Sequence, residues 1–266
     1  MKRSTTFFAL VTLGLLGYGF YQAMFAAPTE ATMGDVQRIF YYHLPHAWVA
    51  FLLFFTNFLA SIWYMVRRSE RSDALALASA EVGVVFCTVV LVTGPLWARP
   101  VWGIWWTWDA RLTSTLVLWL IYVSYLVLRR FATGAQTQVL AAALAIFGFI
   151  DVPIVYLSIR YFRTQHPQPV IAGGEGSGLD PRMWIAVLWN LAGFLAVALL
   201  LVRLRYSLAL AENALEEAHA NLALRAPAEM PQPQQANSGL VGDPAATTGG
   251  EPPESDSALK LGNKPR

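Results

Sequence analysis

The sequence predicts an all-α membrane protein that crosses the bilayer six times. Of its 266 residues, 56% are hydrophobic and only 14% are charged, whereas roughly 25% are charged in a typical soluble domain. The apolar residues are gathered into long blocks, and about 20 such residues are needed to cross roughly 30 Å of hydrocarbon. Because a backbone in lipid must satisfy its own hydrogen bonds, each block is expected to form a helix.

Six blocks meet this length requirement. In chain order they are Phe7–Phe25, Ala47–Val66, Leu75–Gly94, Thr113–Leu128, Val139–Ile159 and Trp184–Val202. The fourth block is the shortest, so we expect its helix to extend into the segment before it.

The first block also has features of a secretory signal peptide. Lys2 and Arg3 precede an apolar stretch that ends at Ala26-Ala27. However, the apolar part is as long as a full span, with Tyr18 and Tyr21 near one end. We therefore expect it to be retained as a transmembrane helix; cleavage would leave five spans without moving the later loops to the other side.

Lysine and arginine near the span ends predict the orientation. The denser set belongs in the cytoplasm by the positive-inside rule, and it consists of Lys2, Arg3, Arg67, Arg68, Arg71, Arg129, Arg130, Arg203 and Arg205. Both termini are then cytoplasmic. The outer segments are about Ala26–His46, Pro95–Leu112 and Arg160–Met183.

The pattern divides the chain into three parts. Residues 1–203 form the six-helix domain, which contains a tryptophan-rich segment at 95–113. Residues 204–225 carry leucines at helical spacing among charges, which predicts a cytoplasmic helical extension or, as the alternative, a coiled-coil contact. Residues 226–266 are rich in Pro, Gln, Gly and Ser and are predicted to be disordered.

Charge and cysteine content exclude several classes of function. The net charge is only +2, and the arginines are scattered without a basic stripe, so no nucleic-acid partner is expected. The single cysteine, Cys87, excludes an intrachain disulfide, a CxxC redox pair and a cysteine zinc cage.

Half of the ten tryptophans lie in one outer segment. They are Trp97, Trp102, Trp105, Trp106 and Trp108. An interfacial aromatic belt would instead distribute single residues over many helix ends. If the segment is helical, Trp102, Trp105, Trp106 and Asp109 share one face. That face would be a rigid platform suited to a large, flat, apolar ligand.

Two charged residues at the membrane edge leave two interpretations open. Asp109 and Arg111 could pair with each other or cap the fourth helix. Alternatively, Arg99 and Arg111 could pair with ligand carboxylates, for which the guanidinium fork is well suited.

The histidines add a metal-ligating possibility. His43 and His46 lie at the start of the second span and His166 just beyond the fifth, all on the side of the tryptophan segment, while His219 is in the tail helix. Two histidines from different loops beside an aromatic platform would suit a six-coordinate haem. His46 is one helical turn from His43 and is a rival ligand.

Residues Trp102–Thr113 read Trp-Gly-Ile-Trp-Trp-Thr-Trp-Asp-Ala-Arg-Leu-Thr. This run resembles the "WWD" signature of haem-handling membrane proteins. With six spans and a histidine on either side, the chain resembles the CcmC family, haem exporter protein C of cytochrome c maturation, over about residues 37–203. The resemblance implies that His43 and His166 are axial haem ligands. It also implies a haem-binding set of Trp102, Trp105, Trp106, Trp108, Asp109 and Arg111, with Arg111 the candidate propionate partner.

The same resemblance implies a role and partners. Proteins of that family display haem b, bound transiently as cargo, at the periplasmic face for the haem chaperone CcmE. The CcmA/CcmB ATP-binding-cassette complex and CcmD then free the loaded chaperone. The chain has no GxxxxGK[ST] phosphate loop, so we expect a ligand-presenting subunit and not an enzyme. The expected location is the bacterial inner membrane or the inner membrane of a bacterium-derived organelle.

Two other functions are compatible with parts of the sequence. Glu81 and Asp151 fall inside spans, where ionisable residues are costly and often functional, so a small-solute or ion transporter is the alternative. Hydrogen bonds to neighbouring helices would also explain these carboxylates. A CcmF- or CcsA-like haem lyase component fits less well, because such proteins are larger and have more spans.

Overall fold

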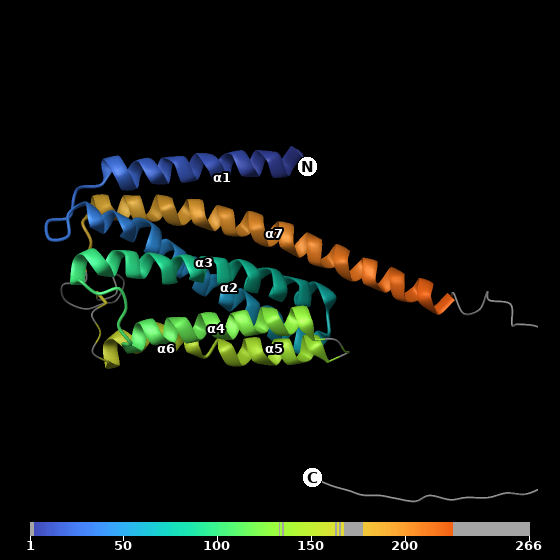
Figure 1. Cartoon of the computed structure of the whole chain (residues 1–266). Helices are drawn as coiled ribbons and strands as arrows, with labels where there is room; N and C mark the ends of the chain where they lie inside the picture. Colours follow the sequence, from blue (N-terminus) through green and yellow to red (C-terminus); the bar gives the residue numbers. More distant parts are fainter. Residues whose placement is uncertain are drawn as a thin grey trace, which may run out of the picture. The chain divides into compact units, whose positions relative to one another are not determined.

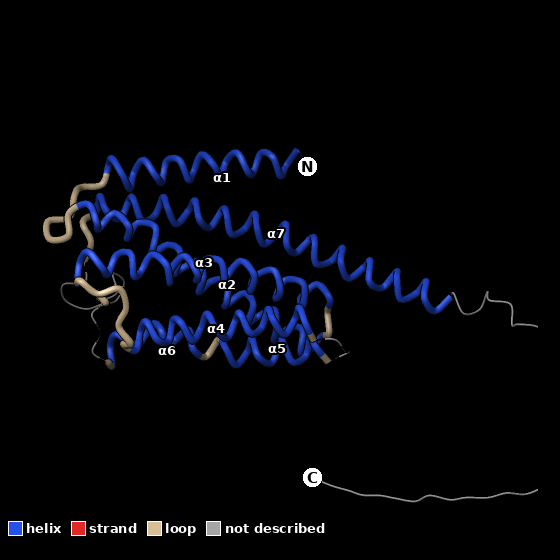
Figure 2. Tube along the Cα trace, viewed as in Figure 1, coloured by secondary structure: helices blue, strands red, loops and turns tan. Residues whose placement is uncertain are grey.

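The computed structural model describes residues 3–132, 134, 136–162, 164, 166–167 and 178–225. These residues are almost entirely helical, and the described part of the chain contains no strand (Figure 2). The predicted disordered tail, residues 226–266, lies outside the described residues, as do Lys2 and Arg163. Residues up to Asn221 form one compact unit, which contains every contact discussed below.

Seven α-helices follow one another along the described part of the chain (Figure 1). They are α1 (Arg3–Tyr21), α2 (Phe40–Arg67), α3 (Glu70–Trp102), α4 (Ala110–Phe131), α5 (Thr137–Gly148), α6 (Asp151–Tyr161) and α7 (Pro181–Arg225). A π-helical turn, Gln22–Ala26, extends α1, and a 3₁₀ turn, Asp35–Ile39, precedes α2.

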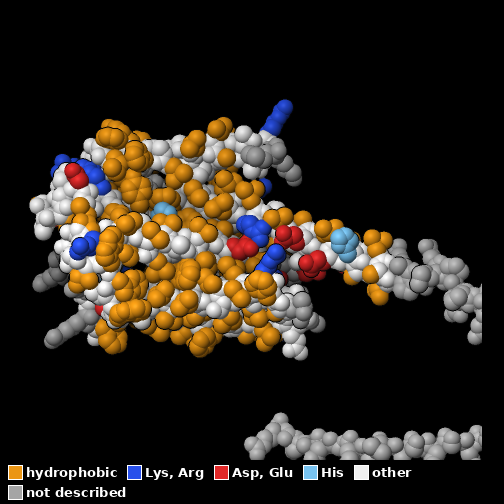
Figure 3. Space-filling view, viewed as in Figure 1, with side chains coloured by type: hydrophobic (Ala, Val, Ile, Leu, Met, Phe, Trp, Pro, Cys, Tyr) orange, Lys and Arg blue, Asp and Glu red, His pale blue; other side chains and the backbone are white. Residues whose placement is uncertain are grey.

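Six stretches are long and apolar enough to span a membrane, as predicted. They are Arg3–Ala26, Asp35–Arg67, Glu70–Trp102, Ala110–Phe131, Thr137–Tyr161 and Pro181–Leu224. Apolar side chains cover most of the face seen in Figure 3, and many of them are exposed. An exposed apolar surface of this extent is suited to lipid and not to water. The chain is therefore a multi-pass membrane protein.

The core lies where α2 packs against α3, with α4, α5 and α6 beside them (Figure 1). Phe54 on α2 stacks on Tyr122 of α4 with ring centroids 3.8 Å apart. Both rings are fully buried. The fifth span breaks between α5 and α6, where Asp151 and Pro153 follow the break. The connections after α3 and after α6 lie at the same end of this unit, which sets the position of the candidate site.

The third span is longer than the sequence predicted. α3 has 33 residues and continues through Pro95 and Pro100 to Trp102, so at about 1.5 Å per residue it is roughly 50 Å long. It ends at Gly103, whose φ of 75° is a left-handed conformation that glycine adopts without steric cost. The condition for one helical tryptophan face, a helix that continues through the segment, is therefore not met. Trp102 ends α3, whereas Trp105, Trp106 and Asp109 lie beyond the helix.

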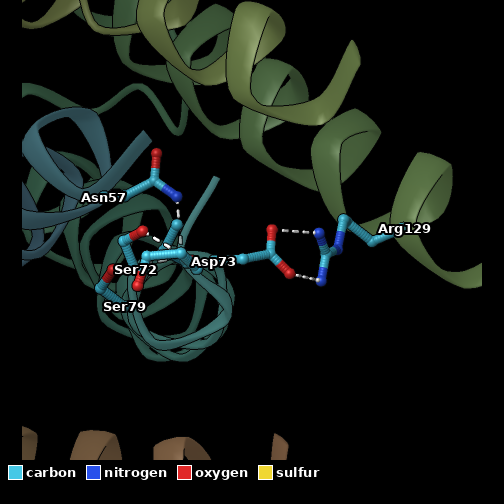
Figure 4. A network of polar contacts seen from close by, with 7 residues as sticks. Asn57, Ser72, Asp73, Ser79 and Arg129 are labelled. Atoms are coloured by element: carbon cyan, nitrogen blue, oxygen red, sulfur yellow. Dashed lines mark hydrogen bonds and ion pairs between the residues drawn. The ribbon is translucent and has the colours of Figure 1, made fainter. Parts of the chain in front are cut away.

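The arginine-rich end of the unit is held by two ion pairs between helices. Arg129 of α4 donates two hydrogen bonds to Asp73 in the first turn of α3, one of them 2.8 Å long (Figure 4). Arg205 of α7 makes a similar two-point contact with Glu81 of α3, with Nη2 2.7 Å from Oε1. Glu81 is therefore bound to a neighbouring helix, as expected if its role is structural.

Candidate functional site

A cavity opens at the end of the unit where α2 begins and α3 ends. Its empty volume, open mouth included, is about 930 Å³. Its walls are mainly apolar, with a few polar side chains. The predicted residues among its lining are His43, Trp102, Trp106, Asp109, Arg111 and His166.

His43 lies in the first turn of α2 and is buried. Its Nδ1 is 2.8 Å from the hydroxyl of Thr93 on α3. That hydroxyl donates to the carbonyl of Val89 at 2.7 Å, so the Thr93 oxygen accepts a hydrogen bond from the imidazole. Nδ1 of His43 therefore carries the proton, and its Nε2 lone pair is free to bind a metal ion.

His166 comes from the connection after α6 and faces the same cavity. Its Nδ1 is 2.9 Å from the carbonyl oxygen of Pro167, which can only accept, so Nε2 of His166 also keeps its lone pair. Desolvation of the ring and, to a smaller extent, the nearby Arg111 charge together lower the pKa of His166 to about 4. The imidazole is thus neutral at physiological pH, the form that ligates metals. The ring centroids of His43 and His166 are 6.5 Å apart.

His46 lies away from this pair. Its Nδ1 is 2.7 Å from the carbonyl of Tyr42. Its ring packs against Phe194 at 4.1 Å and Phe86 at 5.0 Å between centroids. It is absent from the lining of the cavity. The side chain that α2 directs toward the tryptophan segment is that of His43.

The five tryptophans divide into two groups. Trp97, Trp102 and Trp106 line the cavity, and Trp97 and Trp102 lie 6.4 Å apart between ring centroids. Trp105 is 56% exposed and Trp108 is 76% exposed, and neither lines the cavity. Arg99 lies over the Trp105 ring and donates to the carbonyl of Gly103. The aromatic wall therefore comes from both the end of α3 and the connection that follows it.

Asp109 connects three elements at the cavity wall. One carboxylate oxygen accepts from the backbone N–H groups of Arg111 and Leu112, at 3.0 and 2.9 Å, and so caps α4. The other oxygen accepts from the hydroxyls of Thr107 at 3.0 Å and Thr164 at 2.8 Å. Asp109 therefore caps the fourth spanning helix, which was one of the two interpretations of this residue. Its second oxygen also binds the segment that carries His166.

Arg111 begins α4 and lines the cavity beside Asp109. Its Nη1 is buried and has no hydrogen-bond partner among the described residues. A buried guanidinium nitrogen without a partner is costly unless an anion supplies one. Arg111 is thus the cavity residue best suited to bind a carboxylate of a ligand.

Two polar residues of the site were not identified from the sequence. Thr93 lies near the end of the apolar block Leu75–Gly94, and Thr164 is in the connection that follows α6, so neither stands out by composition. Thr93 is 50 residues from His43, and Thr164 is 55 residues from Asp109. The proximity of Thr164 to His166 was a weak signal, whereas for Thr93 only the packing of α3 on α2 reveals the contact.

The sequence is similar to those of known proteins. Residues 1–221 match the family model described as CcmC, heme exporter protein C. The chain belongs to the CcmC family. It is 36% identical to heme exporter protein C of Bradyrhizobium diazoefficiens over 181 residues, or 68% of each chain. It is 33% identical to the Escherichia coli K12 protein of the same name over 218 residues, covering 77% of this chain and 81% of the relative.

Membership of the CcmC family assigns the chain to haem handling in cytochrome c maturation. Haem is the transported cargo of this family, and its members are membrane subunits and not members of a known enzyme class. The transporter alternative depends on Glu81 and Asp151, and Glu81 is paired with Arg205. Asp151 follows the break in the fifth span, and its Oδ2 is buried without a hydrogen-bond partner among the described residues.

Proposed function

We propose that the cavity holds haem at the periplasmic face of the inner membrane and presents it to the chaperone CcmE. The observation that carries this proposal is the pair of imidazoles, His43 and His166, which face one cavity 6.5 Å apart between centroids. With metal–nitrogen distances of about 2 Å, two imidazoles on opposite sides of one metal ion have centroids roughly 6 Å apart. Each ring has its Nδ1 hydrogen-bonded and its Nε2 available.

Each other group at the cavity then has a defined task. Arg111 binds a haem propionate through its unpartnered Nη1. Trp97, Trp102 and Trp106 contact the macrocycle and exclude water from the iron ligands. Trp105 and Trp108 are exposed and do not line the cavity, so they would contact the macrocycle only where it projects from the cavity. Asp109 holds the connection that carries His166.

The redox and bond-forming chemistry belongs to the haem and its acceptor, and this chain supplies ligands and orientation. The CcmA/CcmB complex and CcmD act after loading, to free the chaperone. The positive-inside rule supports a cytoplasmic position for the arginine-rich end of the unit, and hence a periplasmic position for the cavity at the opposite end.

The test is the absorption spectrum of the detergent-purified full-length protein, expressed with CcmE and ample haem. We expect bound haem with a six-coordinate, low-spin spectrum. His43→Ala and His166→Ala should each lose or change that spectrum and reduce the haem attached to CcmE. His46→Ala is the matched control, because His46 is one turn from His43 but packs on Phe86 and Phe194.

Haem absent from the wild-type protein under these conditions would contradict the proposal. A spectrum that depends on His46 and not on His43 would contradict the ligand assignment alone. Haem binding that survives loss of either cavity histidine, with loading of CcmE intact, would assign the histidines a structural role.

A further inference from the structure

A second cavity lies at the arginine-rich end of the unit. It is bounded by the first turns of α1, by Trp63 near the end of α2, by the start of α3 and by α7 near Leu200. Its empty volume, open side included, is about 1,900 Å³. It shares no residue with the histidine cavity.

The cavity is formed because α1 approaches α7 closely only toward the opposite end. There, Asn190 of α7 donates a 2.9 Å hydrogen bond to the carbonyl of Gly19 on α1. A Cβ on Gly193 would lie 3.1 Å from a methyl of Leu16. No equivalent hydrogen bond joins the first turns of α1 to α7 among the described residues, and the cavity occupies that region.

The walls of this cavity are amphipathic. Phe8 and Leu200 contribute apolar surface, while Trp63, which is 56% exposed, and Tyr206 contribute aromatic rings with a polar edge. Aromatic residues of this kind are enriched at the level of the lipid headgroups. The cavity therefore offers an apolar interior next to a polar rim.

Two arginines on the rim set the charge preference. Arg71 and Arg203 line the cavity and are exposed. Among the described residues neither forms an ion pair, whereas Arg129 and Arg205 at the same end are paired with Asp73 and Glu81. The rim thus carries two uncompensated positive charges and no lining carboxylate.

We propose that this cavity binds an anionic phospholipid of the cytoplasmic leaflet, with its phosphate between Arg71 and Arg203 and its acyl chains against Phe8 and Leu200. Basic pockets between transmembrane helices on the cytoplasmic side recognise anionic headgroups, and guanidinium groups suit phosphate. The bound lipid would fill the space between α1 and α7. It would thereby hold the first span against the rest of the protein.

The experiment uses the full-length protein in nanodiscs of phosphatidylcholine containing one fifth phosphatidylglycerol. Lipid retained after mild detergent extraction is counted by native mass spectrometry. We expect the wild type to retain phosphatidylglycerol in preference to phosphatidylcholine. Arg71→Gln/Arg203→Gln should lose that preference, by about fivefold for each arginine removed.

Two further variants separate a site from general surface charge. Arg68→Gln/Arg130→Gln removes two exposed arginines at the same end that do not line the cavity, and it should keep the preference. Leu200→Trp keeps both rim arginines but fills the apolar interior, and it should reduce retention of both lipids. Circular dichroism and gel filtration check that each variant folds.

Three results would overturn the proposal. One is equal retention of the two lipids by the wild type. Another is an equal loss in both double-arginine variants, which would indicate non-specific attraction to the membrane surface. The third is displacement of phosphatidylglycerol by millimolar inorganic phosphate or by micromolar haem, which would assign the rim arginines to a soluble anion or to haem instead of a lipid.

Discussion

Each cavity histidine is held in its ligating form by one neighbouring hydrogen-bond acceptor of its own. Thr93 accepts from Nδ1 of His43, and the carbonyl of Pro167 accepts from Nδ1 of His166. Such partners fix the tautomer and orientation of metal-binding imidazoles. His166 is oriented further by Thr164, whose hydroxyl accepts from the His166 backbone N–H at 3.1 Å and donates to Asp109 at 2.8 Å. Asp109 therefore acts on the proposed ligand through a threonine.

Replacing Thr164 tests this connection. Thr164→Val keeps the shape of the side chain but removes both hydrogen bonds, one of them to a carboxylate, which are worth about 1–3 kcal/mol. We expect roughly tenfold weaker haem retention and a shift away from the six-coordinate spectrum, measured by haem dissociation from the purified protein. Thr164→Ser should behave like the wild type. Unchanged dissociation in Thr164→Val, from a protein whose wild type binds haem, would show that Asp109 does not position His166.

Helix packing brings the two sides of the cavity together. Glycine on α3 allows α2 to approach closely: a Cβ on Gly83 would lie 2.7 Å from Cε1 and 3.0 Å from Cδ1 of Phe54. Phe54 cannot move aside easily, because it is fully buried and stacked on Tyr122. Small residues at such contacts are typical of helix pairs in membranes. The sequence predicted both helices but not which of their faces meet.

The substitution Gly83→Ala should therefore destabilise the protein. Overpacking of a buried contact costs about 1–3 kcal/mol, and we expect a lower midpoint in thermal gel-filtration assays of the detergent-purified protein. The matched control is Gly14→Ala on α1, where a Cβ would meet nothing within 4 Å. Equal midpoints for the two variants would indicate that the α2–α3 contact adjusts without strain.

At the scale of the whole molecule, charge is placed at the two ends of the described unit, and the spans between are mostly apolar (Figure 3). The cavity histidines lie at one end. The Asp73–Arg129 and Glu81–Arg205 pairs lie at the other and join α3 to α4 and to α7. The side chains of Asp73 and Arg129 are only 8% and 12% exposed. A charge buried to this degree depends strongly on its partner.

Removing one partner of this pair should be more harmful than removing both. Asp73→Ala leaves Arg129 uncompensated, so we expect a loss of about 3 kcal/mol in stability, seen as reduced folded yield and a lower thermal midpoint. Asp73→Leu/Arg129→Met should recover most of that loss. The exposed Asp180–Arg182 pair is the comparison, and Arg182→Gln, which keeps the hydrogen bond of the Asp180 side chain to the first turn of α7, should leave the midpoint unchanged. A double variant no better than Asp73→Ala would contradict this account.

The sequence by itself determined the six spans and the residue types at the functional end. Long apolar blocks have few alternatives to a spanning helix, and a tryptophan-rich run between spans is visible without coordinates. Only the tertiary structure decided that His43 and not His46 shares a cavity with His166, and that Trp97 replaces Trp105 and Trp108 in its wall. Helical periodicity describes the faces of a single helix and not how helices pack together. The expected tryptophan face also required a continuous helix, and Gly103 ends that helix. Contacts such as Thr93 with His43 and Thr164 with Asp109 join segments far apart in the chain, so they arise from helix packing that no local pattern encodes.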